Sequence, residues 1–208
     1  MLLERLVLLL SANEKTGKYS KPVKKLLINQ FGAALLGIMM YTASSNSVPV
    51  NVFTSLFSIC FYMVIIYTAM WDIGAADRVK VDGGRLTKDL FTGTKAALIA
   101  GIPNIILGVL CSLFTLINGM ADAVVIIARN IAVMWESMYS GLLWAIFPKT
   151  LQVVEKKMYY TYDVLENPAA FGYMSLYLVI VIPAIVAATL GYIAGYSNFK
   201  IVRNGKSN

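Results

Sequence analysis

The chain has 208 residues and a formal net charge of +7. Hydrophobic residues make up 58% of it and charged residues only 14%, and the mean hydropathy is +0.69, values that exclude an ordinary soluble domain. The sequence contains no histidine, which excludes histidine-based acid–base catalysis, histidine-ligated haem and the common zinc sites. Cys60 and Cys111 lie singly in apolar runs, so neither a thiol-redox motif nor a disulfide framework is indicated.

Residues 1–25 form a basic N-terminal segment that starts with the apolar stretch MLLERLVLLL. This stretch is short, carries Glu4 and lacks a cleavage site of small residues, so a retained interfacial helix is favoured over a signal peptide. The lysines that follow it would meet anionic lipid, at about 1 kcal/mol per basic residue. We expect the segment to anchor the chain on the cytoplasmic face of the membrane.

Four later segments are apolar and long enough to cross about 30 Å of hydrocarbon. They are residues 26–43, 52–71, 96–117 and 171–196. Because lipid cannot satisfy exposed backbone groups, such segments cross as helices. The sequence therefore predicts an all-α integral membrane protein, with a bundle of four transmembrane helices in a single domain over residues 26–196.

The positions of the basic residues predict the orientation of these spans. Segments 1–25, 72–95 and 197–208 hold six, five and three of the 18 lysines and arginines, and four spans place all three segments on one side. Basic residues accumulate in short cytoplasmic loops. We therefore expect both termini in the cytoplasm, and the composition fits the cytoplasmic (plasma) membrane of a bacterium.

The long outer loop, residues 118–170, contains an apolar stretch over residues 122–147 that has one polar side with Arg129 and Glu136. One placement is an amphipathic helix lying flat in the outer interface. The other is a fifth span in which both charges face the bundle interior, since charges in hydrocarbon are costly unless paired or hydrated. A fifth span would put the basic tail outside, so the flat helix is favoured.

The cytoplasmic loop, residues 72–95, holds four acidic and five basic residues. The turn sequence Asp82-Gly83-Gly84 inside VKVDGGRLT predicts a small hairpin, followed by a short amphipathic helix. Mixed charge in a short loop is typical either of a docking surface for a partner or of a self-neutralising turn. The candidate docking residues are Asp77, Arg78, Lys80 and Arg85.

Two prolines inside the predicted spans, Pro103 and Pro183, are expected to bend their helices, because each removes a backbone hydrogen bond. Bent helices in corresponding places occur at the central sites of transporters, although single prolines are also common in ordinary membrane helices. The residues that could line a polar path are Pro103, Asn104, Pro183, Arg129 and Glu136.

Small residues recur at helix-packing spacing, which allows two helices to approach closely in lipid. They serve either the bundle itself or contact with a partner. The candidates are Ala187, Gly191, Gly195, Gly101 and Gly108.

The sequence offers no catalytic motif, cofactor site or metal site, so we expect no enzyme and no nucleic-acid binding. Its mix of features favours a small accessory or assembly subunit that contacts the lipid bilayer and binds a membrane protein partner or itself. The alternative is a small permease or transporter subunit. A membrane-embedded lipid-headgroup enzyme is a minor alternative, because the four aspartates of residues 72–95 are spaced too widely for a helical metal site.

Overall fold

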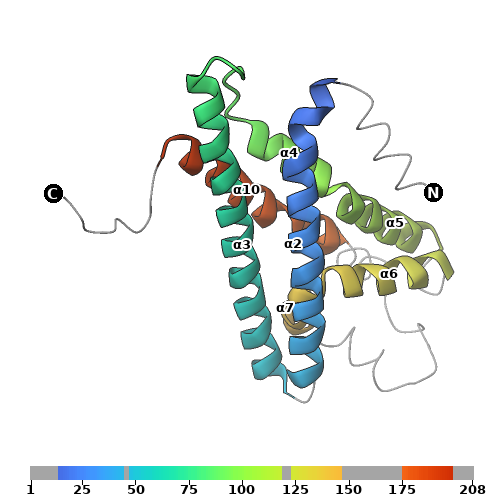
Figure 1. Ribbon diagram of the computed structural model, residues 1–208. Coiled ribbons are helices and arrows are strands. Elements are labelled where there is room, and N and C mark those ends of the chain that lie inside the picture. Colours follow the sequence, from blue (N-terminus) through green and yellow to red (C-terminus); the bar gives the residue numbers. More distant parts are fainter. Residues whose placement is uncertain (1–13, 45–46, 119–122, 147–174, 199–208) are drawn as a thin grey trace. The chain divides into compact units, whose positions relative to one another are not determined.

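The computed structural model describes residues 14–44, 47–118, 123–146 and 175–198 (Figure 1). All regular structure in these ranges is helical, and they contain no strand. Residues 1–13, where the interfacial helix is expected, all of residues 147–174 and most of the basic tail lie outside them. The elements are α2 (Glu14–Ser44), α3 (Val48–Asp82), α4 (Thr92–Ala100), α5 (Ile102–Asn118), α6 (Ala123–Trp135), the 3-10 helix η1 (Ser137–Tyr139), α7 (Ser140–Ile146) and α10 (Val181–Tyr196).

Three of the described helices are long and apolar enough to cross a membrane, namely Tyr19–Ala43, Pro49–Asp82 and Ser175–Tyr196. A fourth span is obtained when α4 and α5 count together as one broken helix. The predicted all-helical fold is therefore confirmed, and the spans fall on the predicted segments. The helices themselves are longer, since α2 starts at Glu14 and α3 runs on to Asp82.

The predicted hairpin at residues 79–87 is wrong, because α3 continues as a helix to Asp82 and the rest of this stretch contains no strand. The ion pairs Lys80–Asp77 at 2.8 Å and Arg78–Asp82 at 3.6 Å join residues three and four apart, a spacing that supports helical turns. The helix ends at Asp82, and Gly84 after it has a φ of 70°, the left-handed conformation that closes many helices. The two glycines thus terminate a helix and do not connect two strands.

Both prolines coincide with interruptions of their helices. The chain breaks at Gly101, and Pro103 then occupies the second position of α5, where its missing N–H costs little. The last span is interrupted at Ile180, three residues before Pro183. A further proline, Pro22, lies within α2.

The chain divides into two compact units, and α2 and α3 contribute residues to both. Unit 1 comprises residues 1–28, 63–100 and 184–208, and unit 2 comprises residues 29–62 and 101–183.

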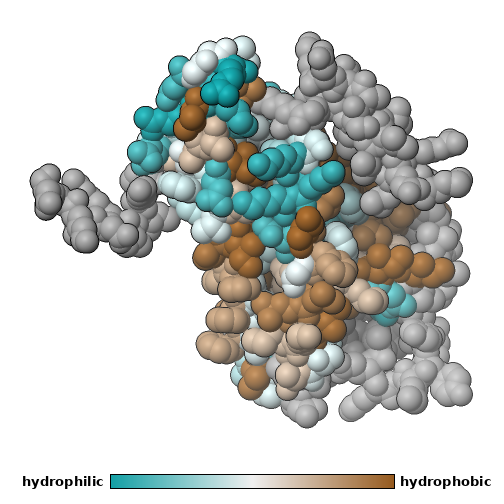
Figure 2. Space-filling model, in the orientation of Figure 1, coloured by the Kyte–Doolittle hydropathy of each residue, from teal (hydrophilic) through white to brown (hydrophobic). Residues whose placement is uncertain are grey.

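Apolar side chains cover the outer faces of the long helices. Phe31 of α2 and Phe53 of α3 are 54% and 71% exposed, and Phe57 is 51% exposed. On the face drawn in Figure 2, hydrophilic residues gather at the C-terminal end of α3, and apolar residues predominate along its remaining length. Large exposed apolar surfaces of this kind are stable in lipid and not in water.

In unit 1, α10 packs on α3 and α4 through glycines. A Cβ atom on Gly191 would overlap the backbone of Tyr67, and one on Gly195 would overlap the backbone of Trp71. Gly93 of α4 meets α10 in the same way. These glycines are therefore used within the chain's own fold, which is one of the two roles that their spacing predicts.

Replacing Gly195 by alanine should lower the free energy of unfolding by about 1–3 kcal/mol, because the added methyl group overlaps the Trp71 backbone. The matched control is Gly32→Ala, where no atom lies within 4 Å of the new Cβ and the helix should be unchanged or slightly stabilised. Thermal unfolding in mild detergent, followed by circular dichroism, measures both. Equal midpoints for the two variants would contradict the packing described.

Candidate functional site

The interior of unit 2 is lined by a polar stripe on α3. Four of its members are almost fully buried, at 6% exposure or less, and recur at intervals of four, three and four residues: Asn51, Ser55, Ser58 and Tyr62. This spacing places them on one face of the helix. The phenylalanines of the opposite face are exposed, so α3 has its polar side inward and its apolar side outward.

Helix α5 carries a second inward stripe of polar and small residues. Its members are Asn104, Gly108, Cys111, Ser112 and Thr115. The Ser112 and Thr115 hydroxyls donate to carbonyl oxygens one turn earlier, so their polarity is satisfied within the helix. Gly108 packs directly against Leu178, which accounts for this member of the predicted small-residue set.

The segment that joins α6 to α7 packs on α2 at three points one turn apart. The Gln30 amide donates to the Trp135 carbonyl at 3.2 Å, and the Ser137 hydroxyl donates to the Ala34 carbonyl at 2.6 Å. Gly37 lets the backbone of the segment approach so closely that a Cβ would overlap it. The segment is therefore held in the interior of unit 2.

The expected continuous helix over residues 122–147 is wrong, because it breaks at Glu136, whose φ and ψ are −114° and 25°. Polar contacts fix both sides of the break. The Trp135 indole N–H donates to Asn104 Oδ1 at 2.7 Å, and the Gly141 backbone N–H donates to Ser55 Oγ at 2.8 Å. These contacts replace the regular turn that a straight helix would have.

The polar side of α6 faces inward. Arg129 and Glu136 are 7% and 1% exposed, whereas Ile127 and Met134 are 61% and 62% exposed. A helix lying flat at an interface would instead turn its charged side to water. The observed burial supports the alternative in which both charges face the protein interior.

Glu136 is the most unusual group in this interior. Neither of its carboxylate oxygens receives a hydrogen bond from any residue in the described part of the chain, Arg129 included. Because the side chain is buried without a hydrogen-bond donor, the charged carboxylate is disfavoured relative to the neutral acid. These surroundings therefore favour the protonated carboxyl group.

Three other titratable side chains interact electrostatically with Glu136. They are the phenols of Tyr62 and Tyr139 and the thiol of Cys111, and Cys111 also interacts with Arg129. The Tyr62 hydroxyl donates to Gln30 Oε1, while the Tyr139 hydroxyl has no partner among the described residues. The cluster can hold a proton or a small cation.

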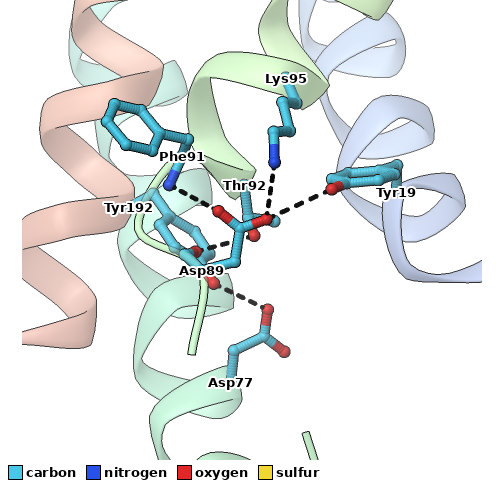
Figure 3. Close-up of polar contacts among 7 residues, drawn as sticks. All are labelled: Tyr19, Asp77, Asp89, Phe91, Thr92, Lys95 and Tyr192. Atoms are coloured by element: carbon cyan, nitrogen blue, oxygen red, sulfur yellow. Dashed lines mark hydrogen bonds and ion pairs between the residues drawn. The ribbon is translucent and has the colours of Figure 1, made fainter. Parts of the chain in front are cut away.

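Unit 1 contains a different polar cluster, drawn in Figure 3, which centres on Asp89 just before α4. Its Oδ2 accepts from the Tyr19 hydroxyl at 3.3 Å and from Lys95 Nζ at 2.9 Å, and its Oδ1 accepts from the Phe91 backbone N–H at 3.0 Å. The last contact is typical of a carboxylate that caps the start of a helix. Asp89 thus joins the N-terminal part of α2 to the start of α4.

A neighbouring carboxylate, Asp77, links α3 to α10. It is 6% exposed, accepts from the Tyr192 hydroxyl at 3.2 Å and pairs with Lys80 at 2.8 Å. Tyr192 is also hydrogen-bonded to the Thr92 side chain (Figure 3). Both carboxylates have several donors, so this cluster is suited to holding helix ends together.

The predicted docking residues do not form one surface. Asp77 is buried in the Tyr192 contact, whereas Lys80 and Arg85 are exposed and Arg78 is half-buried. The four aspartates of residues 72–95 bind separate partners, and no group of three or more potential metal ligands occurs among the described residues. Of the remaining small residues, Gly101 is buried at the break before α5 and Ala187 is half-buried in α10.

The structure brings part of the predicted polar path together. Asn104 bonds Trp135, the residue before Glu136, and Arg129 is buried on the same helix as Trp135. The sequence analysis missed Gln30 and the polar stripe of α3. A polar residue at every third or fourth position of an otherwise apolar span is the signal that could have found that stripe.

No family model, curated protein or solved structure matches the chain. A proposal for the function must therefore be based on the geometry of the two polar clusters, around Glu136 in unit 2 and around Asp89 in unit 1.

Replacing Asp89 by alanine should lower the free energy of unfolding by about 1–2 kcal/mol, because the variant loses three hydrogen bonds, of which the one to half-exposed Lys95 counts least. The control is Asp82→Ala, which removes an exposed ion pair with Arg78 worth about 0–0.5 kcal/mol. Thermal unfolding compares the two, and hydrogen exchange of residues 83–91 should rise only in the Asp89 variant. A larger loss in the Asp82 variant would contradict the assignment.

Proposed function

We propose that the protein is a small permease that moves a polar solute through the interior of unit 2. In this proposal it lies in the cytoplasmic membrane of a bacterium with both termini in the cytoplasm, as the distribution of basic residues favours. The residues that contribute to the path are Gln30, Asn104, Arg129, Glu136 and the polar stripe of α3.

The observation that carries the proposal is the burial of Glu136 without a hydrogen-bond donor, inside helices whose outer faces are apolar. Burying an unsatisfied polar group costs several kcal/mol, so a fold that served only as a scaffold would gain by replacing it with an apolar residue. Ionisable residues inside membrane proteins typically mark the route of an ion or a substrate.

The break at Glu136 supports the same function. Non-helical backbone at membrane depth is tolerated where it is enclosed by protein or lines a hydrated cavity. Gln30, Ala34 and Gly37 enclose this break on the α2 side. A segment held by a few polar contacts can open to water more easily than a continuous helix.

The accessory-subunit hypothesis retains less support. Gly191, Gly195 and Gly108, which the sequence offers for contact with a partner, pack against residues of the chain's own units. Asp77 of the docking set is buried. Contacts within the chain therefore account for these features without a partner.

A test of the permease function is the reaction of single cysteines with a water-soluble, membrane-impermeant methanethiosulfonate cation. In a background lacking Cys60 and Cys111, Ser137→Cys is compared with Met134→Cys, which is 62% exposed on the outer face of α6. The interior cysteine should react at least about tenfold faster, because the reagent requires water and lipid excludes it. A second pair on α5 compares Asn104→Cys, at an interior position, with Ile106→Cys, on the outer face.

Gel filtration checks that each variant is folded before its reaction rate is compared. Slow reaction at both interior positions, equal to that of the lipid-facing partners, would mean a dry interior and would contradict the permease. In that case an accessory role is favoured, and purification of the crosslinked protein from its native membrane would be the way to find a partner.

A further inference from the structure

We propose that Glu136 is a proton-binding site, which is loaded in the conformation described and releases its proton to water when the interior of unit 2 opens. The binding of the proton is argued from the local contacts alone, and its coupling to solute movement rests on the proposed function.

The first argument is that no hydrogen-bond donor offsets the cost of burying a charged carboxylate at Glu136. Its two oxygens have no donor among the described residues, and the side chain is 1% exposed. A buried carboxylate without hydrogen bonds is strongly disfavoured relative to the neutral acid. A bound proton removes the charge without requiring any further ligand.

The second argument excludes a metal ion as the preferred occupant. A metal cation needs several oxygen ligands around it. The oxygen of the Gln30 amide accepts from Tyr62, and the Ser137 hydroxyl is directed at the Ala34 carbonyl. Among the described residues, the Tyr139 hydroxyl is the other polar atom of this cluster that has no partner. These contacts favour a proton over Na⁺.

The third argument concerns release. The titratable groups that interact with Glu136 are Tyr62 of α3, Cys111 of α5 and Tyr139 of η1, and the α2 residue at this point is the uncharged Gln30. Arg129, two turns earlier on α6, interacts with Cys111. Water that entered an opened interior would supply the hydrogen bonds that the carboxylate lacks in the conformation described, so the proton could then leave.

The test is labelling with dicyclohexylcarbodiimide, an apolar reagent that modifies protonated carboxyl groups in apolar surroundings. The full-length protein is labelled in mild detergent, and the modified residue is located by mass spectrometry. Glu136 should be labelled at pH 7, and the rate should fall at least about tenfold at alkaline pH, because only the protonated carboxyl group reacts. Glu136→Gln should lose the label at this position.

Two controls make the result specific. Asp72→Asn removes an exposed carboxylate that pairs with Lys25 and should leave the labelling of Glu136 unchanged. Replacing choline by Na⁺ as the cation of the buffer salt, at fixed pH, should also leave the labelling of Glu136 unchanged. Protection by Na⁺ would overturn the proton site in favour of a metal-ion site. Absence of label on wild-type Glu136 at pH 7, or a rate independent of pH, would overturn it outright, even if the glutamine variant failed to fold.

The two proposals can fail separately. If labelling of Glu136 depends on pH but the interior cysteines react slowly, the proton site is supported and the permease function is contradicted. Fast reaction of those cysteines with no labelling of Glu136 would keep the permease and remove the proton site.

Discussion

A charged or polar side chain in an apolar environment must be satisfied by other protein groups or by water, and this constraint orders unit 2. Helices α3 and α5 turn their polar and small residues inward, and their large apolar residues outward. Almost every polar group of this interior that the structure describes in detail has a partner. Glu136 does not, and it stands where the chain departs from helical geometry. Burial without compensation is therefore concentrated at Glu136 and the neighbouring Tyr139 hydroxyl.

Unit 1 shows the opposite arrangement of carboxylates. Asp77 and Asp89 each accept from several donors, and both join helix ends rather than interrupt a helix. Networks in which every member is satisfied make a fold rigid and unique. The cluster of unit 1 holds helices together, whereas the cluster of unit 2 contains a carboxyl group without hydrogen-bond donors. Such an unsatisfied group is expected at a site that changes its protonation or its contacts.

The sequence was sufficient to predict the helical membrane fold, because span length and apolar composition follow directly from bilayer thickness. It also indicated Asn104, Arg129 and Glu136 as candidates, since polar residues in apolar stretches are conspicuous. It did not predict the break at Glu136, which depends on contacts with Ser55, Ala34 and Gln30 far away in the chain. The hairpin did not form because α3 continues to Asp82, and Gly83 and Gly84 then end this helix instead of joining two strands.

The most direct test of this account is the infrared spectrum of the protein in lipid, with the spectrum of Glu136→Gln subtracted. The account predicts a carbonyl stretching band of a protonated carboxyl group at neutral pH, which disappears at alkaline pH when Glu136 loses its proton. A difference spectrum with only carboxylate bands at neutral pH would show that Glu136 is ionised. That result would contradict the central claim, because an ionised Glu136 would require partners or water that its surroundings do not provide.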